Sequence, residues 1–128
     1  MKKYLVTILI LASLHSCIID RVIIADFIIE NNTDLNLEFI TFDNGIEVIY
    51  PINSFDNNSI GEYNISEQVF PSDIIDSVIV KFSDNKILKY HKSDSCNSNK
   101  SFFCISNTIC INNVCTFEID DGEYKKAK

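Results

Sequence analysis

Apolar and polar residues alternate along most of this chain, and this pattern limits it to a fold built from β-strands. The strongest case surrounds Asn44-Gly45, a dipeptide that favours the tight turn of a β-hairpin. Apolar residues occupy every second position of residues 35–39 before this turn and of residues 46–50 after it. Because side chains two apart share one face of a strand, the sequence predicts a hairpin over residues 35–50, ended by Pro51.

A second hairpin is predicted further along the chain. Residues 77–82 alternate as a strand, and residues 83–85 are polar and typical of a turn. Residues 86–91 then return, with Leu88 and Tyr90 on the inner face. This arrangement leaves the side chain of residue 91 on the solvent side of its strand.

The remaining segments carry weaker signals. The first predicted strand, residues 22–30, has an inner face made of Ile23, Ala25, Phe27 and Ile29. Other elements are predicted as short strands within 61–69 and at 101–105 and 114–119, a turn at 70–73, and a frayed helix within 120–128. Seven or eight short antiparallel strands favour an all-β fold, a small antiparallel β-sandwich. A small barrel and an α+β arrangement are the alternatives.

The N-terminal segment is typical of a secretory signal peptide. Lys2 and Lys3 give it a positive start, and residues 5–14 are almost entirely apolar. A small residue, Ser16, then directly precedes Cys17. The apolar run is shorter than the roughly 20 residues that a membrane-spanning helix needs. The sequence therefore predicts export and removal of the segment.

The residues around Cys17 resemble the lipobox of bacterial lipoproteins, in which the chain is cut before a cysteine that carries lipid. Leu14 and Ser16 match this pattern, whereas His15 departs from it. The alternative is a plain signal peptide cut nearby. A single acyl chain binds a membrane weakly and two or more bind it firmly, so a lipidated Cys17 would anchor the chain stably.

Three segments follow from these boundaries. They are the signal peptide at 1–16, the lipidated anchor with its short linker at 17–21, and one β-sandwich domain at 22–128.

The cysteine count supports an oxidising compartment. The chain has five cysteines, and four remain without Cys17: Cys96, Cys104, Cys110 and Cys115. An even number in an exported chain predicts two disulfides, and three pairings are open. The spacing lacks the C-x2-C knuckles of structural zinc sites. Free thiols and a metal site are the alternatives.

The charge of the chain disfavours a nucleic-acid partner. The net charge is −7, and removal of Lys2 and Lys3 leaves 18 acidic against 9 basic residues, or −9. No basic stripe is available to neutralise phosphates. Anionic membranes repel an acidic surface, so the lipid on Cys17 is the expected means of membrane attachment. An acidic surface also suits a basic protein partner.

No catalytic constellation stands out. His91 is the only histidine left after removal of the signal peptide, and it falls on a solvent-facing strand position. Motifs for serine hydrolases, zinc proteases and phosphate-binding loops are missing from the sequence. Residues 56–67 match a calcium loop in part, but Ile60 replaces a ligand and the flanks are not helical. We therefore expect a non-enzymatic chain without cofactor or metal.

The overall layout resembles small uncharacterised lipoproteins of Bacteroidota. The resemblance rests on the lipobox, the strand and turn at 27–33, the strand at 77–82 and the ending at 117–127. It implies membrane attachment and an immunoglobulin-like or related β domain, and it implies no known activity. Acidic residues just after the lipid cysteine accompany surface export in that group, and residues 18–21 lack such a run. A periplasm-facing position at the outer membrane is therefore expected.

Two functions fit these observations. The first is a lipid-anchored cell-envelope protein whose β domain is structural or binds an unidentified partner. The second is a periplasmic inhibitor or immunity lipoprotein that neutralises a basic envelope hydrolase through its acidic surface.

Overall fold

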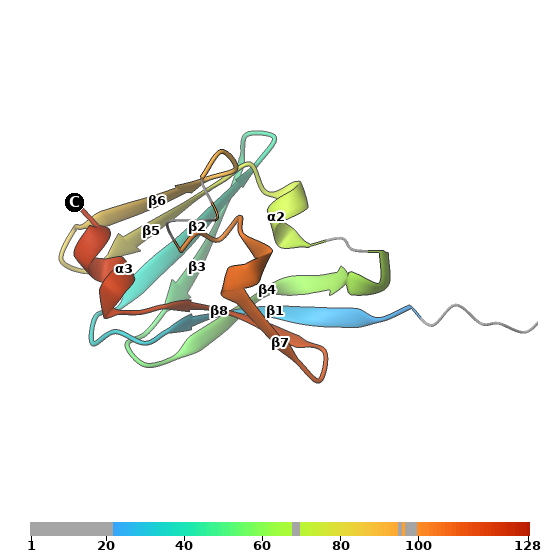
Figure 1. The fold of residues 1–128 in the computed structure, drawn as a ribbon. Coiled ribbons are helices and arrows are strands. Elements are labelled where there is room, and N and C mark those ends of the chain that lie inside the picture. The colour runs from blue at the N-terminus through green and yellow to red at the C-terminus, as the bar shows by residue number, and fades with distance from the viewer. Residues whose placement is uncertain (1–21, 68–69, 95, 97–99) are drawn as a thin grey trace, which may run out of the picture.

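Two four-stranded sheets form the molecule in a computed structural model, which describes residues 22–67, 70–94, 96 and 100–128 (Figure 1). Sheet A has the order β4 (Asn57–Asn64), β1 (Ile24–Asn31), β8 (Val114–Ile119) and β7 (Thr108–Ile111). Sheet B has the order β3 (Ile46–Ile52), β2 (Leu37–Asp43), β5 (Ser77–Phe82) and β6 (Ile87–His91). All neighbouring strands are antiparallel except β1 and β8. The predicted small β-sandwich is confirmed.

Both predicted hairpins are present. Asn44 and Gly45 take positive φ angles of 47° and 81° in the turn between β2 and β3, as a two-residue hairpin loop requires. Strand β3 does not end at Pro51, as the sequence predicted, but continues to Ile52. Proline is tolerated there because β3 is an edge strand and its outer side needs no backbone donor.

Strand β1 shows the predicted inner face. Ala25, Phe27 and Ile29 are buried, whereas Ile23 precedes the strand and is 40% exposed. Strand β4 begins at Asn57, earlier than the sequence predicted, and an irregularity in its pairing with β1 falls next to Phe27. It is followed by the 3₁₀ helix η1 (Ile65–Glu67), and the one-turn helix α2 (Pro71–Ile74) occupies most of the turn predicted at 70–73.

The predicted strand at 101–105 is wrong. Residues 101–104 form a turn, with Cys104 N–H donating to the Ser101 carbonyl at 3.1 Å. The 3₁₀ helix η2 (Ile105–Asn107) follows, and β7 starts only at Thr108. The apolar Phe102 suggested a strand, but its ring is instead inserted into the core from this turn.

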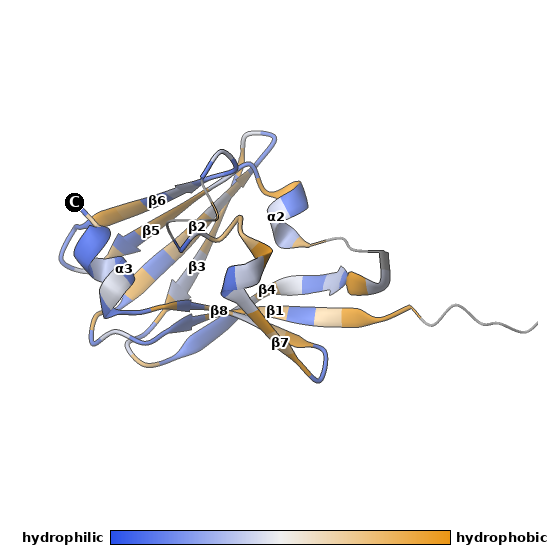
Figure 2. Ribbon diagram, in the orientation of Figure 1, coloured by the Kyte–Doolittle hydropathy of each residue, from blue (hydrophilic) through white to orange (hydrophobic). Residues whose placement is uncertain are grey.

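Aromatic rings connect the two sheets at the centre of the core. Tyr90 contacts Phe117 with 5.7 Å between ring centroids, Phe117 contacts Phe102 at 5.6 Å, and Phe102 contacts Phe39 at 5.4 Å. All three pairs meet edge to face, the geometry that ring quadrupoles favour. Burial of each such side chain stabilises the fold by about 1.5–3 kcal/mol. The alternation of apolar and polar residues along the strands is visible in Figure 2.

The C-terminal helix predicted within 120–128 is α3 (Asp121–Lys126), and it is tied to the sandwich. The Asp120 carboxylate accepts a hydrogen bond from Glu123 N–H at 3.0 Å and caps the helix. Backbone hydrogen bonds in both directions then join Lys128 to Ile87, at 2.9 and 3.1 Å. Within the described residues, no helix is long and apolar enough to cross a bilayer.

Candidate functional site

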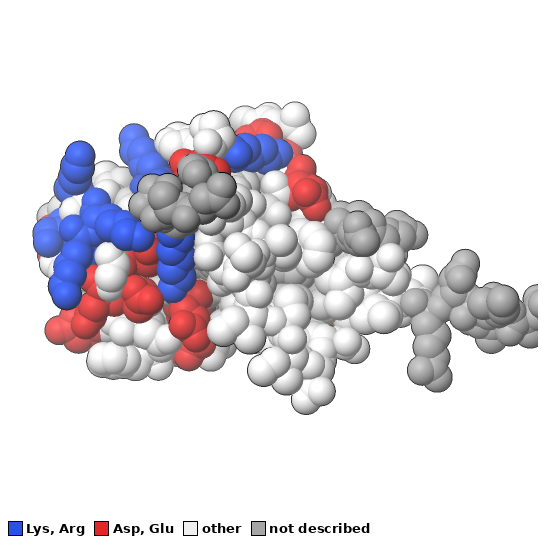
Figure 3. Space-filling model, in the orientation of Figure 1, with Lys and Arg blue, Asp and Glu red and all other residues white. Residues whose placement is uncertain are grey.

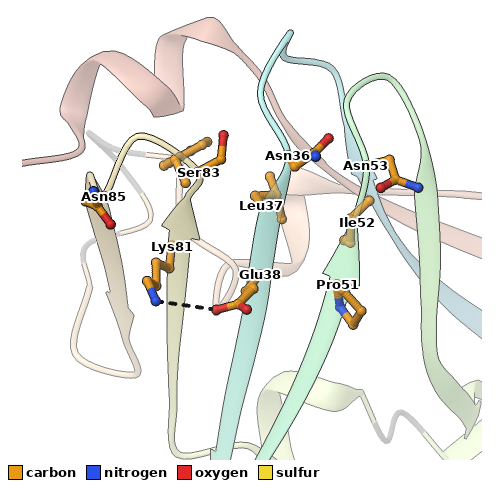
Figure 4. Close-up of a pocket in the computed structure, with 10 residues that line it drawn as sticks. Asn36, Leu37, Glu38, Pro51, Ile52, Asn53, Lys81, Ser83 and Asn85 are labelled. Carbon is orange, nitrogen blue, oxygen red and sulfur yellow. Dashed lines mark ion pairs between the residues drawn. The ribbon is translucent and has the colours of Figure 1, made fainter.

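A polar pocket lies at the end of the sandwich opposite the start of β1 (Figures 1 and 4). This distal pocket has a volume of about 340 Å³ and lies where β2, β3 and β5 meet three loops. Its lining is rich in amide and hydroxyl side chains, namely Asn36, Asn53, Ser83 and Asn85. Such groups both donate and accept hydrogen bonds, so the pocket suits a polar, hydrogen-bonding partner.

Asn36 joins the three loops around the distal pocket. Its side-chain oxygen accepts a hydrogen bond from Ser54 N–H at 2.9 Å, in the loop between β3 and β4. Its backbone carbonyl accepts another from Ser83 N–H at 2.9 Å, in the turn between β5 and β6. One residue of the loop between β1 and β2 therefore fixes the positions of the other two loops.

Asn31, the last residue of β1, holds two of these loops in place through side-chain hydrogen bonds. It is fully buried, and its side-chain amide donates to the carbonyls of Leu35 at 2.7 Å and Asn53 at 2.8 Å. Its side-chain oxygen accepts from the hydroxyl of Thr33 at 2.7 Å, and Thr33 is itself only 1% exposed. Buried polar networks whose groups are all bonded are rigid, so the pocket is preformed.

The charges in the pocket remain accessible. Lys81 Nζ lies 3.8 Å from Glu38 Oε2, and their side chains are 49% and 45% exposed (Figure 4). An ion pair so exposed contributes little to stability, about 0–1 kcal/mol. Both groups can therefore pair with an incoming ligand. The described residues that line the pocket include neither histidine nor cysteine, and the pocket offers hydrogen bonds and charge.

The other candidate catalytic and metal-binding residues do not come together in the structure. His91 is exposed at the end of β6 opposite the β5–β6 turn that lines the pocket. Residues 57–64 of the partial calcium motif form strand β4 and not a loop. Among the described residues, no three side chains of His, Cys, Asp or Glu are grouped as metal ligands would be.

The structure pairs the four downstream cysteines in chain order. Cys96 is bonded to Cys104, and Cys110 is bonded to Cys115. The second bond crosses the β7–β8 hairpin between directly opposite residues. Sequence reasoning left three pairings open because it could not place this hairpin. Cys17, the predicted lipid site, lies outside the described residues.

A second polar cluster, which the sequence analysis missed, lies between β6 and α3. Glu123 is 2% exposed and accepts hydrogen bonds from the Tyr90 hydroxyl and, at 2.6 Å, from Lys126 Nζ. Burial of the Tyr90 hydroxyl is the larger cause, and its hydrogen bond to the Glu123 carboxylate the smaller one, of a pKa of Tyr90 far above its usual range. The hydroxyl therefore stays protonated and acts as a permanent donor, which is a structural role.

Lysine side chains are concentrated at one end of the molecule, where acidic side chains lie among them (Figure 3). Six lysines lie on or beside β6 and α3, as Figure 3 shows in part: Lys86, Lys89, Lys100, Lys125, Lys126 and Lys128. By contrast, the four strands of sheet A contain no lysine or arginine. The outer face of sheet A is therefore either acidic or uncharged.

No family model, no curated protein and no solved structure matches this chain.

Proposed function

We propose that this chain is a lipid-anchored protein of the bacterial cell envelope, and that its β-sandwich is a non-catalytic binding or structural domain. One relationship carries the proposal. Ile24, where β1 starts, follows Cys17 by only seven residues, and β1 runs from there to Asn31, beside the distal pocket. A seven-residue tether spans at most about 25 Å, so a lipid on Cys17 would hold the start of β1 close to the membrane.

This attachment would present the distal pocket to the aqueous compartment. Strand β1 has eight residues, which corresponds to a length of about 26 Å at about 3.3 Å per residue. The loops at its far end would thus lie well outside the headgroup region. We place the domain in the periplasm, at the outer membrane, and the two disulfides support an oxidising compartment.

Metabolic labelling with a fatty-acid analogue tests the anchor. The full chain is expected to take up label and to sediment with membranes, whereas the Cys17→Ala variant is expected to lose the label and leave the membrane fraction. Ser16→Ala is the matched control, because it keeps a small residue before the cysteine and should keep the label. A Cys17→Ala variant that is labelled as strongly as the control would contradict the proposal.

Photo-crosslinking in cells tests the binding role of the distal pocket. A photoreactive amino acid at Asn85, on the pocket rim, is expected to give a discrete adduct. The same amino acid at Glu62, which is exposed on β4 of sheet A, is the control. Equal labelling at the two positions would argue for a structural domain without a specific partner at this pocket.

A second function, inhibition of a basic envelope hydrolase, is favoured by the outer face of sheet A. That face carries Asp26, Glu30 and Glu118 on the neighbouring strands β1 and β8, with no basic residue on the same strands. Such a surface attracts a cationic partner, and salt weakens the attraction. A stoichiometric, salt-sensitive inhibited complex in a panel of envelope hydrolases would support this function, and its absence across the panel would rule it out.

A further inference from the structure

Four exposed aliphatic side chains gather on the outer face of sheet A, at the end where the chain enters β1. Ile24 is 44% exposed, Ile109 55%, Ile111 65% and Val114 37%. Ile111 lies opposite Val114, and Val114 lies beside Asp26, two residues along β1 from Ile24. Isolated exposed aliphatic residues are common, but a contiguous group of them marks a contact surface. We call these four residues the aliphatic patch.

The aliphatic patch is held in a defined shape. Asn112 and Asn113 take positive φ angles of 50° and 63° in the tight turn of the β7–β8 hairpin. The carbonyl of Asn113 accepts a hydrogen bond from Asp26 N–H at 2.9 Å, which docks the tip of the hairpin against β1. The disulfide between Cys110 and Cys115 closes the same hairpin. Little conformational freedom therefore remains to be lost when the patch meets a partner.

We infer that the aliphatic patch rests on the lipid bilayer, beside the anchor. This inference depends on the proposed lipidation of Cys17. Val22 and Ile23 are 61% and 40% exposed and continue the apolar surface from Ile24 toward that residue. A tether of at most about 25 Å keeps the patch within reach of the headgroup region.

The distribution of charge fits this orientation. The lysines lie over β6 and α3, whereas the surface near the chain's entry into β1 is largely uncharged in the view of Figure 3. Asp26 lies beside Val114 and borders the patch, but its carboxylate accepts a hydrogen bond from the Ser59 hydroxyl of β4, and Glu62 lies opposite it on that same strand β4. Anionic headgroups repel these carboxylates, so the corner of sheet A at the β7–β8 turn, and not the edge formed by β4, faces the bilayer.

A single introduced tryptophan tests the contact, because the chain contains none. Ile111→Trp places the fluorophore in the aliphatic patch. Ile49→Trp is the matched control, since Ile49 is 48% exposed on β3, an edge strand of the other sheet. The full chain is purified in its lipidated form and reconstituted into phosphatidylcholine vesicles whose acyl chains carry bromine, which quenches tryptophan at close range. Mass spectrometry of the same sample reports whether Cys17 carries lipid.

The expected result is a blue-shifted I111W emission that brominated lipid quenches severalfold more than the I49W emission. Equal, weak quenching in a lipidated sample would overturn the inference and leave the anchor standing. A blue shift without quenching, accompanied by a dimer in light scattering, would also overturn it and assign the patch to a second copy of this chain. An unlipidated sample would refute the anchor. Quenching of I111W in that sample would still support bilayer contact, and its absence would refute both proposals.

Discussion

The hydroxyl of Tyr90 on β6 donates a hydrogen bond to the carboxylate of Glu123 on α3, and both residues are only 2% exposed. Lys126 supplies the opposite charge to the same carboxylate from the next turn of the helix. A buried carboxylate is tolerated only when its charge is compensated by such partners. The pair therefore attaches the C-terminal helix to sheet B, and its two members depend on each other.

Removal of the Tyr90 hydroxyl should loosen this attachment. We expect Tyr90→Phe to lower the free energy of unfolding by about 1–3 kcal/mol, because Glu123 loses one of its two partners while it stays buried. Denaturant unfolding measures this change. Tyr50→Phe is the control, since the Tyr50 hydroxyl has only a 3.5 Å contact with the Ile60 carbonyl. Equal losses in the two variants would show that the bond to Glu123 contributes nothing specific.

The cap of α3 should make stability depend on pH. Burial raises the pKa of Asp120, but the Glu123 N–H and the Lys100 ammonium outweigh it and hold the pKa below its ordinary value of 3.8. A carboxyl with a lowered folded-state pKa contributes stability that is fully present above its unfolded value. This contribution is lost as the pH falls below that value and through the folded-state pKa.

Asp120→Ala tests this contribution. At neutral pH the variant should lose about 1 kcal/mol of stability, as is typical of a missing N-cap. The difference from the unmodified chain should shrink as the pH falls below about 4, near the ordinary Asp value. Asp121→Ala is the control, because Asp121 is an exposed residue in the first turn. If the difference in free energy of unfolding between the D120A variant and the unmodified chain stayed constant down to acid pH, the Asp120 carboxylate would not be the source of this stability.

Asn31 should control the rigidity of the distal pocket. Its replacement by Ala removes the side-chain donor of the Asn53 carbonyl, one of the two donors of the Leu35 carbonyl and the acceptor of the buried Thr33 hydroxyl, so we expect a loss of about 2–3 kcal/mol. Hydrogen exchange should speed up in the loop residues 32–36 and 53–56. Asn32→Ala is a suitable control because Asn32 is exposed. Unchanged exchange in the N31A variant would show that the loops hold themselves in place.

The cysteine pairs can be read directly from the oxidised protein. Mass spectrometry of unreduced peptides should find Cys96 with Cys104 and Cys110 with Cys115. Replacing both Cys110 and Cys115 by serine should cost about 2 kcal/mol, the loop-closure value for so short a loop. A crossed pairing in the mass spectrum would contradict the placement of the β7–β8 hairpin.

Local patterns predicted the parts of the fold that local contacts build. The turn at Asn44-Gly45 and the alternation in β5 and β6 correspond to observed hairpins. The strand prediction at 101–105 is wrong because the turn formed there depends on the bond between Cys96 and Cys104 and on the insertion of Phe102 into the core. Neither of these long-range constraints leaves a periodic signal in the sequence.

The distal pocket was harder to foresee than the strands. It combines loops that are distant in sequence, and only the folded chain brings Asn36 against Ser54 and Ser83. One signal was present, however. Asn31 continues the inward alternation of Phe27 and Ile29, so the pattern predicts a buried amide one residue beyond the strand predicted at 22–30. No comparable sequence pattern predicts the parallel pairing of β1 with β8.

That pairing has a mechanical consequence. Strand β1 lies between β4 and β8, and it matches β8 at six consecutive positions, from Asp26 with Val114 to Asn31 with Ile119. A pull on the N-terminus acts along the axis of β1, so it loads the hydrogen bonds on both of its sides in shear. Bonds loaded in shear share the force and must fail together, whereas those of an edge strand peeled sideways break one at a time. A domain tethered through β1 would therefore resist extraction by force better than one tethered through an edge strand.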